Sequence, residues 1–233
     1  MAPDREYWWR QGGVLIFMKA LKFLLIFLII GFCSCGQKSA KHKPDPEAVK
    51  LNNKIVPLVP FIDNIDSSKK ALVFLDSATS IDSNYFLGYY NKLMFLYALK
   101  EYNKAVLAIN NCIRIRPNAH DLFLTGGILY EKIRDTISSK SYFEKSLKIC
   151  NSVLDTMKAN NTNYIFLSTN KAVNLIMLGD AATANRTLKH LYDTLPDAGE
   201  FAAEEKKYIL SFINKNKTDL IKKILLDPDK DIN

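Results

Sequence analysis

A spacing of about 34 residues, typical of helical repeats, recurs through the middle of this chain and limits its possible folds more than any other feature. Small side chains occur at Ala71, Ala105 and Ser139, with an identical interval between them. Two further sets of positions keep the same step, one apolar and one small: Leu75, Ile109 and Phe143, and Ala78, Cys112 and Ser146. A period of roughly 20 to 50 residues indicates a repeat architecture, in which each copy buries its apolar face against its neighbours.

The residues between these positions have the apolar spacing of helices and predict helix pairs. We expect first helices over 89–99, 122–130 and 170–180, and second helices within 70–84, 104–118, 138–150 and 181–191. Small residues such as Ala105 and Ala184 suit places where two helices cross closely. Pro117 and Pro196 end second helices, because proline lacks the N–H and clashes with the preceding turn. The step from Ser139 to Ala184 is longer by about 11 residues than the constant step between the earlier copies. The insertion falls over 151–163.

This pattern resembles the tetratricopeptide repeat, a helix–turn–helix unit of about 34 residues. Gly127 and Tyr130 stand where that family has a small residue and an aromatic one. The resemblance covers about 65–197 and implies an all-α, right-handed helical solenoid of about three to four helix pairs. We expect 48–67, interrupted by two prolines, and 198–227 to be atypical capping helices that cover the exposed ends of the core.

The chain has an export signal before the repeats. Lys19 and Lys22 follow Met18 and precede an apolar run over 23–30, which ends in small and cysteine residues at 31–35. A basic lead, a short apolar stretch and small residues form a secretory signal peptide, and the run is shorter than the roughly 20 residues that span a bilayer. We therefore expect Met18 to be the true start and 1–17 to be upstream extension.

The end of the apolar run resembles a bacterial lipoprotein signal, in which small residues precede a cysteine that is diacylated and becomes the new N-terminus. Ser34 before Cys35 fits this pattern. The resemblance implies lipidation at Cys35. Cys33 is the alternative, disfavoured by bulky Phe32 before it. A secreted protein with incidental cysteines is a further alternative.

These features divide the chain into an upstream extension (1–17), a signal peptide (18–34), a polar tether rich in lysine and proline (35–49), a helical domain (50–227) and an unstructured tail (228–233). No acidic run directly follows Cys35, so we expect a periplasm-facing protein on the outer membrane. The cell surface remains an alternative.

The composition and motifs favour binding over catalysis. The net charge of +8 falls to +6 without residues 1–34, and no dense basic stripe with interleaved aromatics is present, which argues against nucleic acid. His42, His120 and His190 have no metal-ligand spacing, and Gly126-Gly127 lacks the Lys-Ser/Thr of a phosphate loop, so it indicates close helix packing. We expect no enzyme activity, cofactor or metal. Cys112 and Cys150 are expected as buried apolar side chains, with a disulfide between them left open.

In the family that the chain resembles, the first helices line a concave groove that binds peptides or helices. At positions where acidic-tail readers carry Lys and Asn this chain has Tyr90 and Met94, so the groove is expected to be apolar and aromatic. The residues that the resemblance places in it are Leu87, Tyr90, Met94, Tyr97, Leu124, Ile128, Glu131, Val173 and Ile176. The alternative is that this stripe is core or is covered by 55–65.

The sequence therefore predicts an adaptor that is held to the cell envelope by a lipid and binds an unidentified envelope protein or peptide. A surface lipoprotein that captures a peptide or glycan is the alternative. The sequence does not predict an oligomeric state.

Overall fold

The computed structural model describes residues 42–157, 163–195 and 202–225. The chain divides by its internal contacts into 1–39 and 40–233, and every described residue belongs to the second unit. The expected upstream extension, the signal peptide, both candidate lipidation sites and the 228–233 tail lie outside the described residues. Within the described ranges, no helix combines the length and the apolar character needed to cross a bilayer.

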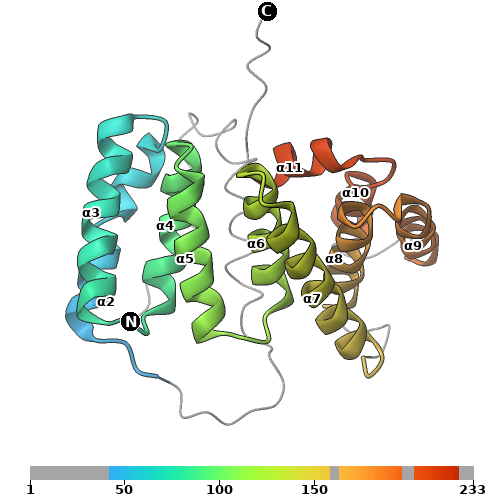
Figure 1. The fold of residues 1–233 in the computed structure, drawn as a ribbon, viewed down its shortest axis with the longest axis horizontal. Helices are drawn as coiled ribbons and strands as arrows, with labels where there is room; N and C mark the ends of the chain where they lie inside the picture. The colour runs from blue at the N-terminus through green and yellow to red at the C-terminus, as the bar shows by residue number, and fades with distance from the viewer. Residues whose placement is uncertain (1–41, 158–162, 196–201, 226–233) are drawn as a thin grey trace, which may run out of the picture. The chain divides into compact units, whose positions relative to one another are not determined.

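Helix pairs follow one another along the described chain (Figure 1). The pairs are α2 (Pro46–Asn53) with α3 (Ile65–Ile81), α4 (Phe86–Ala98) with α5 (Tyr102–Ile115), α6 (His120–Lys132) with α7 (Thr136–Leu154), and α8 (Tyr164–Met177) with α9 (Ala181–Thr194). A 3-10 helix, η3 (Val56–Phe61), joins α2 to α3, and α10 (Ala202–Leu210) and α11 (Lys217–Leu225) end the series. Successive helices from α3 to α10 pack on each other. The prediction of an all-α, tetratricopeptide-like solenoid is confirmed.

The repeat register predicts the core correctly. Every position singled out by the constant repeat step is at most 1% exposed: Ala71, Leu75, Ala78, Ala105, Ile109, Cys112, Ser139, Phe143 and Ser146. The hydroxyl groups of the two buried serines are satisfied, since Ser139 donates to Glu131 Oε2 at 2.7 Å and Ser146 donates to the His120 carbonyl at 2.7 Å. Small residues at these positions let paired helices approach closely and keep the repeat spacing.

The two glycines of α6 mark a close approach between α6 and α7. A Cβ added at Gly126 would lie 2.6 Å from the Tyr142 ring, and one added at Gly127 would lie 2.6 Å from the Phe143 ring. The prediction that Gly126-Gly127 serves close packing is therefore confirmed.

One turn geometry recurs within three of the pairs. Lys100, Arg134 and Gly179 have φ angles of 57°, 66° and 97° and lie just after α4, α6 and α8. In each turn the next N–H bonds back to a carbonyl five residues earlier: Glu101 to Leu96, Asp135 to Tyr130, and Asp180 to Leu175, at 2.8–2.9 Å. This hydrogen bond closes the helix end and places an acidic residue at the start of the next helix, where it complements the helix dipole.

We expect Arg134→Gly to raise the free energy of unfolding by about 0.5 kcal/mol. A positive φ costs an L-residue roughly 1–2 kcal/mol, and glycine returns part of that gain through its larger unfolded-state entropy. Gly179→Ala, at the matching turn, should lower stability by about 1 kcal/mol. Urea unfolding of both variants measures the two effects, and a destabilised Arg134→Gly would contradict this account of the turn.

The helical domain begins earlier than the sequence analysis placed it. Pro46 starts α2 inside the segment predicted as tether, because proline suits the first helical position and the Asp45 carboxylate accepts the N–H groups of Glu47 and Ala48. His42 also belongs to the folded part, with its Nε2 2.8 Å from Asp82 Oδ2. The prediction of a polar tether over 35–49 is thus wrong from His42 onward.

Asp82 fastens this N-terminal segment to the end of α3. Its carboxylate accepts the N–H of Asp45 at 3.1 Å and that of Asn84 at 2.9 Å, besides its contact with His42. Burial would raise the pKa of Asp82, but these hydrogen bonds outweigh it and lower the pKa. The residue itself is buried, with 8% of its surface exposed.

The inserted residues extend helices on both sides of the insertion. α7 continues to Leu154, and α8 begins at Tyr164, six residues before its predicted start at Asn170. The insertion therefore lengthens the third and fourth pairs rather than adding another one.

Candidate partner-binding face

The first helices of the pairs, α4, α6 and α8, carry all the residues predicted to line the groove. On α4, Leu87 is 39% exposed and is the predicted groove residue most open to solvent. Tyr90 is half-buried and stacks on Phe86, with ring centroids 5.5 Å apart. Burial, and next the nearby Asp121 charge, raise the pKa of Tyr90. The start of α4 therefore offers an apolar, aromatic surface that is partly accessible.

The rest of the α4 stripe is covered by the chain itself. Met94 packs against the buried cluster of Ile55, Ala71, Leu75 and Phe95, as the alternative that this stripe belongs to the core allowed. Burial is the largest cause of a raised pKa at Tyr97, whose buried hydroxyl has no hydrogen-bond partner among the described residues. Tyr97 therefore serves packing between helices.

The groove predicted on α6 and α8 is not open. Leu124, Ile128, Val173 and Ile176 are between 0% and 6% exposed and belong to the main core cluster. The expectation that they face an accessible groove is wrong, because they are buried in the core cluster that Leu220 and Leu225 of α11 also join. Whether these residues bind a partner stays a prediction.

α11 crosses this face as an amphipathic helix. Leu220 and Leu225 are 0% and 3% exposed and join the same core cluster as the residues of α6 and α8. Figure 1 shows α11 running across the upright helices rather than continuing the stack. A capping helix was expected within 198–227, but its position on this face was not predicted. The apolar spacing of Leu220, Ile221, Ile224 and Leu225 was the available signal for a buried face.

Glu131 joins α11 to α6. Lys217 Nζ lies 2.8 Å from Glu131 Oε1, and Ser139 Oγ donates to Oε2 at 2.7 Å. The Glu131 side chain is 17% exposed and that of Lys217 is 41% exposed. Burial would raise the pKa of Glu131, but the hydrogen bonds from Lys217 and Ser139 outweigh it and hold the pKa below its ordinary value of 4.5. This predicted groove residue therefore contacts a helix of its own chain.

We expect Lys217→Met to lower stability by about 0.5 kcal/mol at neutral pH, as is usual for a half-exposed ion pair. Because the folded-state pKa of Glu131 is lowered, the ion pair contributes its full share to the free energy of unfolding above pH 4.5. This contribution is lost as the pH falls through the folded-state pKa. Unfolding of wild type and variant across this pH range measures the difference. Lys140→Met is the matched control, since its pair with Glu144 is long, at 3.9 Å, and exposed. A difference that persists at low pH would contradict the assignment.

A buried polar cluster links α6, α7 and α8 beneath this face. Asn174 donates to Ser146 Oγ at 2.9 Å and to the Asn170 carbonyl at 2.8 Å, and Asn170 Nδ2 lies 3.4 Å from His120 Nδ1. Burial lowers the pKa of His120, against the opposing charge of Asp121. These contacts connect the three helices, and His120 takes part in the packing between them.

The two cysteines of the helical domain are free thiols. Cys112 and Cys150 are both fully buried and unpaired, so the disulfide left open by the sequence is not formed in this structure. Burial raises the pKa of each thiol to about 12, which keeps the side chains protonated and apolar. Among residues 42–157, 163–195 and 202–225, no group of three His, Cys, Asp or Glu side chains could hold a metal ion.

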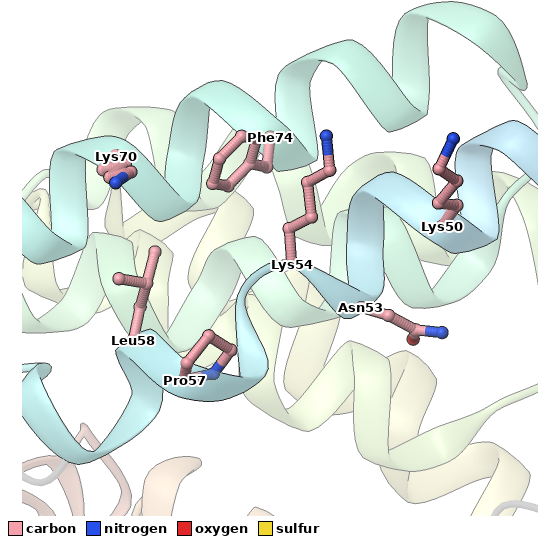
Figure 2. Close-up of a pocket in the computed structure, with 7 residues that line it drawn as sticks. All are labelled: Lys50, Asn53, Lys54, Pro57, Leu58, Lys70 and Phe74. Carbon is pink, nitrogen blue, oxygen red and sulfur yellow. The ribbon is translucent and has the colours of Figure 1, made fainter.

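A second surface, which the sequence analysis missed, lies at the N-terminal end of the series. An open cavity of about 460 Å³ is lined by Lys50, Asn53, Lys54, Pro57, Leu58, Lys70 and Phe74. Figure 2 shows three lysines spread along it, from α2, the turn after α2, and α3. Lys54 Nζ lies 5.4 Å from the centre of the Phe74 ring. The cavity is formed where α2, the turn after it and η3 lie against α3, an arrangement that the sequence pattern did not predict.

Comparison with known families supports the repeat assignment. A family model described as a tetratricopeptide repeat matches residues 88–119, which cover the pair α4 and α5. Comparison with curated proteins finds no match. The helix pairs before and after the matched pair pack in the same way and bury the corresponding positions. The chain therefore contains a tetratricopeptide repeat at 88–119, within a series of helix pairs that pack in the same way.

Proposed function

We propose that this chain is a non-catalytic adaptor of the bacterial cell envelope, which binds an amphipathic helix of a partner protein on the face formed by α4, α6 and α8. Tetratricopeptide repeats are suited to binding other proteins. The observation that carries the proposal is that this face already holds an amphipathic helix, α11, through Leu220, Leu225 and the Lys217–Glu131 ion pair.

The contacts of α11 define the chemistry that this face accepts. Two leucines five residues apart enter the core cluster, and one cation meets the Glu131 carboxylate at 2.8 Å. Binding a helix in a groove through anchors on one side is a common mode of peptide recognition. A partner helix of the same pattern would take the place of α11 and extend toward the exposed Leu87. In this proposal, α11 and the partner compete for one site.

The adaptor is proposed to be anchored through a lipid on Cys35. The support is the sequence itself: a basic lead, an apolar run over 23–30, and Ser34 before the cysteine. Two or more acyl chains would hold the protein stably at a membrane. The outer membrane, with the helical domain in the periplasm, is the proposed location.

In-cell photocrosslinking from single positions tests the binding face. The photoreactive residue replaces Leu87 on α4 or Thr125, a half-buried residue of α6 that lies three positions before Ile128. The matched controls replace Leu107 on α5 or Ile137 on α7. The control residues are 65% and 84% exposed and lie on second helices of the pairs. We expect one specific envelope protein to crosslink from Leu87 and Thr125 and not from the controls. Equal crosslinking from both sets, or none from either, would overturn the proposed site.

A further inference from the structure

The lysine-lined cavity at the N-terminal end of the helical domain is not used by the partner-binding face. From its contacts and its position in the chain, we infer that this surface binds anionic phospholipid headgroups on the membrane that carries the chain. The inference rests on the proposed lipid anchor at Cys35. It adds a second, non-covalent contact with the membrane and a defined orientation for the helical domain.

The charge around the cavity suits an anionic ligand. Lys50, Lys54 and Lys70 are exposed, and the described residues that line the cavity include no carboxylate. Lys50 has one exposed ion pair, with Glu47 at 3.3 Å, which contributes little. No described carboxylate lies within ion-pair distance of Lys54 or Lys70, and the Lys54 ammonium instead faces the Phe74 ring. At least two of the three ammonium groups are therefore available to phosphate groups.

The apolar residues beside these lysines suit the boundary between headgroups and acyl chains. Pro57, Leu58 and Phe74 line the cavity itself. Phe61 follows Leu58 by three residues in η3, and residues three apart share a face in a 3-10 helix. Phe61 and Val56 are each 61% exposed, which is unusual for large apolar side chains so close together. Lysines beside exposed aromatic and aliphatic side chains are typical of surfaces that lie in a membrane interface.

The chain length between the anchor and the cavity keeps the two close. Cys35 precedes His42 by seven positions, and a fully extended chain of this length spans at most about 25 Å. His42 is bound to Asp82 directly after α3. Lys70 lies 12 residues before Asp82, a distance of roughly 18 Å along a helix. The cavity thus stays within roughly 45 Å of the acyl chains, so its effective concentration at the membrane surface is high.

A fluorescence experiment on the full mature chain, purified from membranes, tests the inference. An environment-sensitive dye is attached to Phe61→Cys, and in a second sample to Ile137→Cys as a distant control. The native Cys112 and Cys150 are buried, and acylation would block the thiol of Cys35, so labelling of the lipidated chain is selective for the introduced thiol. The chain is reconstituted in vesicles of phosphatidylcholine with or without phosphatidylglycerol, at low and high salt.

A charge-reversed variant (Lys50→Glu, Lys54→Glu, Lys70→Glu) is compared with an equally charged control (Lys148→Glu, Lys189→Glu, Lys207→Glu).

We expect the dye at position 61 to shift to the blue and brighten in vesicles that contain phosphatidylglycerol, and to lose this response in high salt and in the first triple variant only. Replacing the three lysines should weaken surface docking by about a hundredfold, judged from the usual contribution of each lysine near an anionic membrane. A dye at position 61 that responds no more than the one at 137 overturns the inference. So does an equal loss of the response in both triple variants.

Mass spectrometry of the same sample separates failure of the anchor from failure of the docking surface. An acylated Cys35 together with a silent dye at position 61 overturns docking alone. If Cys35 carries no acyl chain, the anchor proposal fails, and flotation of that chain with phosphatidylglycerol vesicles tests the surface by itself. Flotation that the first triple variant abolishes supports the surface, and no flotation overturns it.

Discussion

Gly127→Val is expected to lower the free energy of unfolding by about 3 kcal/mol, the upper end of what overpacking of a core costs. The added Cβ would meet three atoms of the Phe143 ring at 2.6–2.9 Å, and Phe143 is 1% exposed. A buried ring cannot move away without displacing α6 from α7. Chemical denaturation monitored by circular dichroism measures the change.

Ala203→Val is the matched control, because it adds carbon atoms to a helix at an exposed position, where the change should stay within about 0.5 kcal/mol. Pairing Gly127→Ala with Phe143→Leu should be less destabilising than the two single effects combined, because the smaller side chain makes room for the added Cβ. A Gly127→Val protein as stable as wild type would show that α6 and α7 are not packed as closely as the structure has them.

Leu220→Asp is expected to release α11 from α6 and α8. Leu220 is 0% exposed, and an unpaired carboxylate at that place costs more than a nine-residue helix gains by docking. A free helix of this length is not stable in water, so α11 should unfold. We expect amide protection across 217–225 to disappear and global stability to fall by about 2–3 kcal/mol, the contribution of one fully buried leucine.

Hydrogen exchange measured by mass spectrometry tests this release. Thr218→Asp places the same charge at an exposed position of α11 and should leave the protection unchanged. The Leu220→Asp variant should also bind a hydrophobic dye more strongly, because release of α11 exposes part of the core cluster that Leu220 and Leu225 join. Protection of α11 that survives Leu220→Asp would mean that this leucine does not hold the helix in place.

The sequence predicted the repeats well because their signal is local and periodic. Core positions such as Ala105 and Phe143 lie where two neighbouring helices cross. The constant repeat step identifies them as buried without information about distant parts of the chain. The ends of α4, α5 and α9 were predicted to within three residues for the same reason, whereas α8 begins six residues before its predicted start. Pro46 was misread, since proline is compatible both with an extended segment and with the first turn of a helix, and the contact of Asp82 with His42 is not visible in local pattern.

The candidate face was predicted less well because it depends on contacts between distant segments. Ile128 and Val173 were predicted to line an open groove, but both belong to the core cluster, whose extent the repeat pattern does not define. The position of α11 on this side depends on the turn after α10 and on the pairing of Lys217 with Glu131. Likewise, η3 brings Leu58 beside Phe74 through a bend between two prolines. Neither contact has a periodic signal.

The central claim is that α11 and a partner helix compete for the face formed by α6 and α8. The most direct measurement compares partner crosslinking from Thr125 in three forms of the full chain: wild type, Leu220→Asp, and a form with α11 fixed in place. In the third form, Glu131→Cys and Lys217→Cys are joined by a short bis-maleimide. The control is the same double variant without the crosslinker. The account predicts more crosslinking in Leu220→Asp than in wild type and little in the fixed form. Equal crosslinking in all three forms would contradict it.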